Sequence, residues 1–377
     1  MKMAGKILYI STVTMGALSG CIKPYMPPST TANANVLVVD GLINTADSTI
    51  ILLSRTVIIT NKTTANPETK ATITIENATS TVYTLTETVK GTYVTPALTL
   101  DNTQQYRLRI KTSNGQTYLS DLVPARVTPP IDSVGSNVLP DGLQIYVNTH
   151  DATNNTRYYK YKYQETWQYR SAFNSYYVSN GLSLNLRTPA QYVQYCFGND
   201  FSSNVIVNST ITLSQDLVYQ FPIAVIDSGS EKLETKYSIL VTQQALTSGA
   251  YTYWQDLKSD TEDLGTIFDA LPSQLFGNIH NINNAAEPVI GYISAGTLQK
   301  KRIFITNAQV PQTWTAEYFA ACASQIYLDY GGDPSFLIPL PNPDVYIQPG
   351  NPFVYTTDLC GDCTAQGGSV TQPSFWK

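Results

Sequence analysis

The stretch RYYKYKYQETWQY, residues 157–169, decides the fold because its side chains separate by the two-residue period of a β-strand. One face carries aromatic rings around a carboxylate: Tyr159, Tyr161, Tyr163, Glu165, Trp167 and Tyr169. The other face is mainly amides, hydroxyls and amines: Tyr158, Lys160, Lys162, Gln164, Thr166 and Gln168. A half-buried antiparallel strand has one apolar and one polar face. The pattern therefore predicts rings inside a β-sheet core and lysines in solvent.

Two interpretations of the ring-rich face lead to different functions. As an exposed platform, Trp167 and Tyr169 would stack a sugar or an aromatic ligand, and Glu165 would accept a hydrogen bond from it. As an inner sandwich face, the rings would be buried and Glu165 would need a partner, because an unpaired buried carboxylate is costly. Burial is favoured, since exposed rings side by side promote aggregation. The possible ligand-binding residues are Glu165, Trp167, Tyr169 and, in the long irregular stretch 269–294, His280.

No catalytic residue is assigned from the sequence. Glu165 as a glycosidase carboxylate would require a second carboxylate at a set distance, and the sequence fixes none. His150 and Asp151 resemble a base with its orienting carboxylate, but no Gly-x-Ser-x-Gly elbow supplies a nucleophile.

Short apolar-alternating runs separated by turn residues predict a mainly β chain on both sides of this stretch. In residues 105–112, QYRLRIKT, apolar side chains alternate with cations, and Asn114-Gly115 is a hairpin signal. Such strands predict an N-terminal Ig-like or transthyretin-like β-sandwich, followed by a second, larger β-sandwich-like domain with one or two helices. The first helix is expected at about 249–264, capped by Thr247 or Ser248, and a shorter one at 313–327.

The expected organisation follows the proline-rich breaks. It comprises a signal peptide (1–20), a lipidated N-terminus with a flexible tether (21–35), the N-terminal domain (36–127), the second domain (131–330) and an irregular Pro/Gly-rich tail with a CxxC motif (331–377).

The N-terminus, MKMAGKILYISTVTMGALSGC, combines Lys2 and Lys6 with a short apolar run and small residues before Cys21. This order predicts a secretory signal peptide, and its ending Leu18-Ser19-Gly20-Cys21 resembles a bacterial lipobox, in which the cysteine is acylated. The alternative is an ordinary signal peptide whose cysteine is incidental. Two or three acyl chains on Cys21 would hold the protein stably to a lipid bilayer.

Composition and cysteines narrow the function further. Charged residues are only 14% of the chain, the net charge is −5, and no Lys/Arg cluster forms the footprint of a nucleic-acid partner. Four cysteines remain after Cys21, and an even number in an oxidising compartment favours disulfides, with three pairings open: Cys196, Cys322, Cys360 and Cys363. A zinc site would need two more ligands, so no metal and no cofactor is expected.

Several segments together resemble one family over nearly the whole mature chain. They include VLVVDGLI, IDSV, KYSILVTQQALTSGAYTYWQDL, FGNIHN, PVIGYIS, KRIFI and the ending CGDCTAQGGSVTQPSFW. In this order they resemble the Bacteroidota outer-membrane lipoproteins catalogued as domain of unknown function 4249. The resemblance implies lipoproteins often encoded beside TonB-dependent transporters, and it carries no catalytic residues.

We therefore expect a non-enzymatic outer-membrane lipoprotein that acts as an accessory or ligand-capture partner of a TonB-dependent transporter. The alternatives are a lipid-anchored glycan or peptide hydrolase using Glu165 or His150, and a structural or adhesive envelope protein. The ligand does not follow from the sequence. The leaflet does not follow either, because surface-displayed lipoproteins of the phylum tend to carry acidic residues just after the cysteine, and none lies between Cys21 and Asp40.

Overall fold

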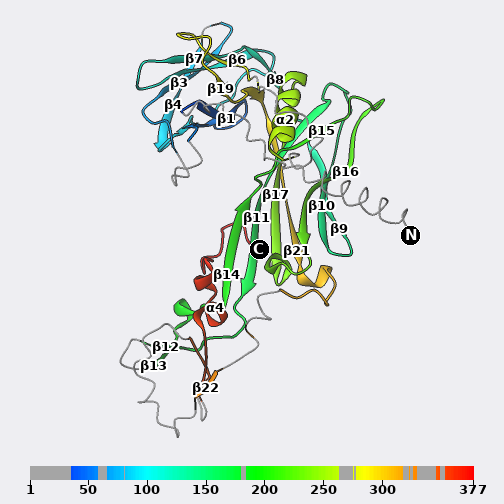
Figure 1. The fold of residues 1–377 in the computed structure, drawn as a ribbon. Helices are drawn as coiled ribbons and strands as arrows, with labels where there is room; N and C mark the ends of the chain where they lie inside the picture. The colour runs from blue at the N-terminus through cyan, green and yellow to red at the C-terminus, as the bar shows by residue number, and fades with distance from the viewer. Residues whose placement is uncertain are drawn as a thin grey trace, which may run out of the picture.

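The computed structural model describes residues 35–57, 66–79, 81–179, 184–262, 275, 277–316, 322, 326–328, 345–348 and 353–377. Strands dominate these residues, which confirms the mainly β prediction. The predicted signal peptide, Cys21 and all but the last residue of the tether lie outside the described residues. Figure 1 shows an N-terminal unit, a middle unit of long strands and a small sheet at the opposite end.

The N-terminal unit is one highly curved sheet. Its strands are β1 (Leu37–Asn44), β2 (Ile50–Arg55), β3 (Thr72–Asn77), β4 (Val82–Val89), β5 (Thr92–Val94), β6 (Gln105–Lys111), β7 (Thr117–Ser120), β8 (Val123–Arg126), β18 (Ile279–Asn281), β19 (Val289–Ile290) and β20 (Ser294–Gly296). The alternation seen in the sequence of β6 is observed, because Tyr106, Leu108 and Ile110 are buried in the core of this unit.

This sheet closes on itself instead of forming two clearly separate layers. Eight strands form a barrel-like ring in the order β6-β3-β4-β5-β2-β1-β20-β8, and β8 pairs back to β6 through Tyr106 and Val123. We expected residues 279–296 in the second domain, but the structure pairs β18 with β7 and pairs β19 and β20 with β1. The strand β20 completes the ring, so a segment distant in the sequence supplies a strand that residues 36–127 do not contain.

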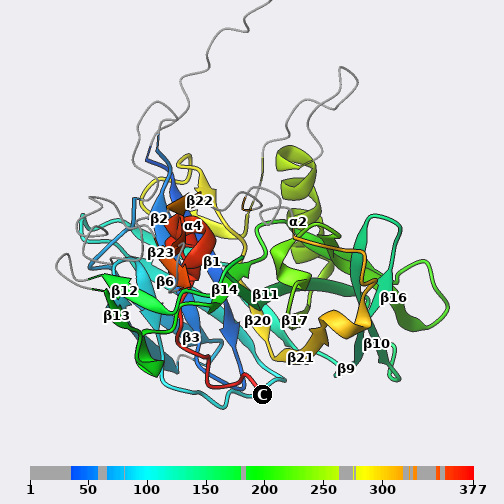
Figure 2. The same cartoon turned by 90° about the horizontal axis from the view of Figure 1, so that it is seen from below.

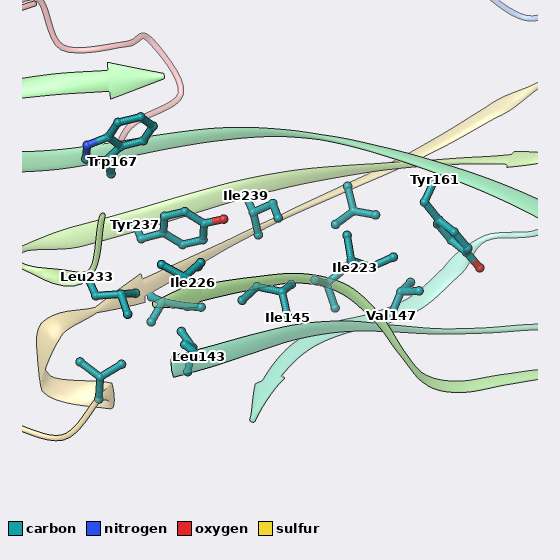
Figure 3. Close-up of a cluster of buried hydrophobic side chains, with 14 of the residues drawn as sticks. Leu143, Ile145, Val147, Tyr161, Trp167, Ile223, Ile226, Leu233, Tyr237 and Ile239 are labelled. Atoms are coloured by element: carbon teal, nitrogen blue, oxygen red, sulfur yellow. The ribbon is translucent and has the colours of Figure 1, made fainter. Parts of the chain in front are cut away.

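The middle unit consists of two facing sheets. One contains β9 (Ile131–Val138), β10 (Gly142–Asp151) and β16 (Asp216–Asp227). The other contains β11 (Tyr158–Arg170), β14 (Tyr195–Phe201), β15 (Ile206–Ser209), β17 (Lys236–Ala245) and β21 (Leu298–Thr306). Their inner faces share one core, in which Ile145 and Val147 of β10 lie across from Tyr161 of β11 and Ile239 of β17 (Figure 3). The stretch 157–169 is thus a strand that contributes its rings to this core.

The helix α2 (Ser248–Thr261) follows β17 and packs against β11, where Tyr158 and Tyr251 lie 4.9 Å apart between ring centroids. Its predicted cap is observed, because the Thr247 hydroxyl accepts a hydrogen bond from the Ala250 amide at 3.2 Å. The short 3₁₀ helices are η2 (Pro189–Gln191), η3 (Glu231–Leu233), η4 (Asn307–Gln309) and η6 (Cys363–Gln366).

The expected helix over 313–327 and the expected irregular tail both differ from the structure. A small sheet contains β12 (Tyr177–Ser179), β13 (Leu184–Leu186), β22 (Ile326–Leu328), β23 (Val345–Gln348) and β24 (Phe353–Thr356), followed by the short helix α4 (Asp358–Gly361). Residues 326–328 are therefore strand, because they pair with β24. The remaining residues between 317 and 325, apart from Cys322, lie outside the described residues.

Two disulfides join the C-terminal segment to the rest of the fold. Cys196 of β14 bonds Cys363, 167 residues away, and Cys322 bonds Cys360. The pairing that the sequence leaves open is therefore Cys196–Cys363 with Cys322–Cys360. Near the C-terminus, the Trp376 ring packs edge-on against Phe197, with ring centroids 5.0 Å apart.

Candidate functional site

Glu165 lies inside the middle unit. Only 4% of its surface is exposed, and its carboxylate accepts a hydrogen bond from the Tyr237 hydroxyl at 2.6 Å. The Lys232 amine lies 2.5 Å from the other carboxylate oxygen. Burial, together with the negative charge of Glu165, raises the pKa of Tyr237 well above its usual value, so this hydroxyl stays a donor. Glu165 is thus the acceptor of a buried polar group that joins β11, β17 and η3.

Trp167 and Tyr169 are also core residues with internal partners. The Trp167 indole N–H donates to the Glu231 carboxylate at 2.9 Å, and the Tyr169 hydroxyl donates to the Cys363 carbonyl at 2.9 Å. Burial raises the pKa of Tyr169 to about 12. The structure therefore brings Glu165, Trp167 and Tyr169 together, but as the packed face of β11.

The two histidines lie apart from this group. His280 is exposed on β18 in the N-terminal unit, with its Nε2 3.5 Å from Asp121 Oδ1. His150 Nδ1 lies 2.8 Å from Asp132 Oδ2, so its carboxylate partner is not Asp151. The Asp151 carboxylate instead accepts hydrogen bonds within the turn that follows it. Although burial alone raises the pKa of Asp151, these bonds, chiefly from Thr153, lower it to about 2.

A cleft between the N-terminal and middle units lies on the opposite face of β11. Its volume is about 390 Å³. The middle unit contributes side chains from three adjacent strands: Lys160, Lys162, Thr242, Gln244, Leu298 and Lys300. The N-terminal unit contributes the outer side of β1 and β2 and the turn between them, including Asp40, Asp47, Ser48, Ile50 and Leu52. Clefts between domains with a few convergent polar groups are where small ligands commonly bind.

Strand register aligns the amines of this cleft. Lys162 of β11 is paired with Thr242 of β17, which is paired with Lys300 of β21. The same face of all three strands therefore presents a row of ammonium, hydroxyl and ammonium groups. Across the cleft, the Lys162 amine lies 3.3 Å from the Asp40 carboxylate.

Lys160 is the unusual member, because it is 6% exposed. Its amine lies 2.9 Å from the centroid of the Trp254 ring of α2, a cation–π position. Within the part of the chain that the structure describes, no carboxylate lies within ion-pair distance of it. Burial first, and then the nearby charge of Lys162, hold the pKa of Lys160 well below its usual value, while Asp40 opposes this shift.

This arrangement suits a ligand that carries negative charge. The described cleft lining holds three lysines and two aspartates. With Lys160 neutral the charges balance (2 − 2), and with Lys160 protonated beside a bound anion the lining carries an excess of one positive charge (3 − 2). An anionic group placed among the amines would supply the counter-charge that Lys160 lacks in the described residues. Strongly shifted ionisable groups in clefts mark functional sites more often than random surfaces do.

The alternation of β11 predicted solvent exposure for this face, which is wrong at Lys160 and at Thr166, 3% exposed. The strand pattern cannot reveal that α2 and a second unit cover that face, because both contacts are long-range. The sequence feature that could have indicated the cleft is the Lys-x-Lys spacing of residues 160–162, together with a second lysine pair at 300–301.

A sequence profile of the family described as Domain of unknown function (DUF4249) matches residues 22–302. The chain belongs to this family. The match confirms the predicted domain family, and it spans every described residue of the cleft as well as Glu165. No curated protein matches this DUF4249 chain.

Solved structures with matching segments include the Yersinia pseudotuberculosis adhesin InvE, at 14% identity and a TM-score of 0.14, covering 56% of the DUF4249 chain and 55% of the adhesin. They also include the chitinase ChiA74 from Bacillus thuringiensis, at 13% identity and a TM-score of 0.16, covering 54% of the DUF4249 chain and 29% of the chitinase. The chain thus spans about half the adhesin and under a third of the chitinase. TM-scores this low carry no argument about fold or function.

The described residues of the DUF4249 chain also bear on membrane crossing and metal binding. None of the helices formed by the described residues is long and apolar enough to cross a bilayer. In the same part of the chain, no three His, Cys, Asp or Glu side chains gather as a metal site requires.

Proposed function

We propose that this chain is a non-enzymatic ligand-capture lipoprotein that holds a small anionic molecule in the cleft between its two units. The observation that carries the proposal is the buried Lys160 amine beside the aligned Lys162 and Lys300, in a cleft whose other wall is the N-terminal unit. The ligand class is a small molecule with a carboxylate or phosphate group, because ammonium groups bind these as point charges.

A non-enzymatic role is supported by the partners of the alternative catalytic groups. Glu165 is buried against Lys232 and Tyr237, where a substrate has no access. His150 is oriented by Asp132 on an exposed strand end. A hydrolase would need one of them beside a bound substrate.

The proposal places the protein at the outer membrane, anchored by acyl chains on Cys21, as an accessory of a TonB-dependent transporter. Its support is the signal peptide and lipobox pattern of residues 1–21, together with the resemblance of the sequence to lipoproteins encoded beside such transporters. The two facing sheets of the middle unit would serve as a β-sandwich frame for the cleft. Pull-down of the tagged protein from detergent-solubilised membranes should recover a large β-barrel transporter. Stoichiometric extraction of this protein alone would count against the partnership.

The cleft is tested by calorimetric titration with citrate, succinate, glutamate and inorganic phosphate, each beside an uncharged analogue. We expect at least one anion to bind, and the Lys162→Ala/Lys300→Ala variant to bind it at least about tenfold more weakly, with binding reduced by added salt. Lys111→Ala is the matched control, since Lys111 is exposed at the end of β6. Equal binding by the cleft variant and the control, or binding of none of the anions, would refute the cleft assignment.

A further inference from the structure

We infer a second binding site, a tyrosine-lined groove for a neutral oligosaccharide at the end of the molecule away from the N-terminal unit. The groove lies between the start of β12, the η2 turn and the start of β14, with a volume of about 530 Å³. Its lining includes Tyr176, Tyr192 and Tyr195 with the amides Asn174 and Gln194. Figure 1 places β12 and α4 at the end opposite β1 and β6, and Figure 2 looks onto that end.

The three tyrosines are much more exposed than the rings of the two cores. Tyr176 is 47%, Tyr192 51% and Tyr195 47% exposed, whereas the tyrosines on the inner face of β11 are nearly or wholly buried except Tyr163. Half-exposed rings around one hollow leave apolar faces that water solvates poorly. The C–H faces of a pyranose ring cover such surfaces, while the tyrosine hydroxyls stay in water.

The polar groups of the groove select the ligand class. Among the described residues, its lining contains no Asp, Glu, Lys, Arg or His, in contrast to the cleft between the units, where five ionisable side chains are described. Asn174 and Gln194 each offer an amide donor and an amide acceptor, which match the paired donor and acceptor character of sugar hydroxyls. A neutral polyhydroxylated ligand fits this lining, and an acidic glycan would find no cation among the lining residues that the structure describes. The hollow shape favours a ligand that enters it over a flat protein surface.

The groove is held in shape by covalent and polar contacts. Tyr195 precedes Cys196, whose disulfide partner Cys363 donates its amide N–H to the Val193 carbonyl at 2.9 Å. On the other side, Arg187 donates to the Ser175 hydroxyl at 3.1 Å and to the carbonyl of Gln191, also at 3.1 Å.

These bonds fix the backbone on both sides of Tyr176 and Tyr192. A preformed site loses less conformational entropy on binding, so a few stacking contacts are enough for measurable affinity.

The test is affinity electrophoresis of the full chain through gels containing starch, β-glucan, xylan or mannan, followed by calorimetry with the matching oligosaccharide. We expect one of these neutral polymers to retard the protein, and Tyr192→Ala and Tyr195→Ala each to weaken oligosaccharide binding about tenfold. Tyr219→Ala is the matched control, because Tyr219 is 72% exposed on β16, outside the groove.

The binding measurements either support or overturn the assignment of the groove to a neutral oligosaccharide. Retardation by none of the neutral polymers, or equal loss in Tyr219→Ala, would overturn it, as would groove-dependent capture of a protein in place of a glycan. The Lys162→Ala/Lys300→Ala variant should retain full oligosaccharide binding, so failure of the anion cleft and failure of the groove are distinguishable. Unchanged thermal unfolding of the tyrosine variants shows that any loss arises in the groove.

Discussion

Replacing Lys232 by methionine tests whether Glu165 is a buried, structurally paired carboxylate. The Glu165 side chain is 5% exposed and the Lys232 side chain 23%, with 2.5 Å between their charged atoms. Breaking a buried ion pair costs about 3–5 kcal/mol because one charge is left unpaired. Nearly a quarter of the Lys232 side chain is exposed to solvent, and Tyr237 would still donate a hydrogen bond to Glu165. We therefore expect the free energy of unfolding to fall by about 2–3 kcal/mol. Methionine keeps the apolar stem and so isolates the charge.

The assay is urea unfolding followed by tryptophan fluorescence, since all four tryptophans lie after residue 166 and report on the middle unit and the C-terminal segment. A loss of this size lowers the midpoint by roughly 1 M urea. The Glu165→Gln/Lys232→Met double variant removes both charges and should recover most of the loss, which gives a coupling energy from the double-mutant cycle. Lys111→Met is the control. A loss below about 0.5 kcal/mol in Lys232→Met, the size typical of exposed pairs, would refute the burial argument.

Two further predictions concern His150 and Gly198. The hydrogen bond to Asp132 raises the pKa of His150 above 6.5, so NMR should find its imidazole titrating above that value and returning toward it in Asp132→Asn. Because the folded pKa is raised, any stabilisation from this pair is present at low pH and lost as pH rises through the His150 pKa; a titration at or below 6.5 in the unaltered protein would contradict the pairing. A Cβ on Gly198 would lie 2.4 Å from the Trp167 indole, so Gly198→Ala should destabilise the chain by about 1–3 kcal/mol and shift tryptophan emission to the red. Wild-type stability and emission in that variant would show that the indole is free to move.

The sequence predicts the inner face of β11 well because that face depends on a local period. Tyr159, Tyr161, Trp167 and Tyr169 are buried as the alternation requires. Even the position of Glu165 among them follows, since strand periodicity fixes its face whatever its chemistry. Its partner does not follow, because Lys232 is 67 residues away and enters through the η3 turn after β16.

The cleft and the ring closure lie beyond local patterns for the same reason. The strand period predicts that Lys160 faces solvent, but in the structure Trp254 of α2 covers its amine. The N-terminal ring needs β20, which pairs with β1 from more than 240 residues further along the chain. Period and turn signals describe each strand and its exposed or buried face, whereas the partner of that face depends on contacts between distant segments.

The strand β11 runs between the two proposed sites. Its thirteen residues extend over roughly 40 Å at about 3.3 Å per residue, with Lys160 near its start and Arg170 at its end paired with Tyr195 of the groove. Because β11 is hydrogen-bonded to strands on both edges, it separates the sites as a stiff spacer, and their ligands should bind independently.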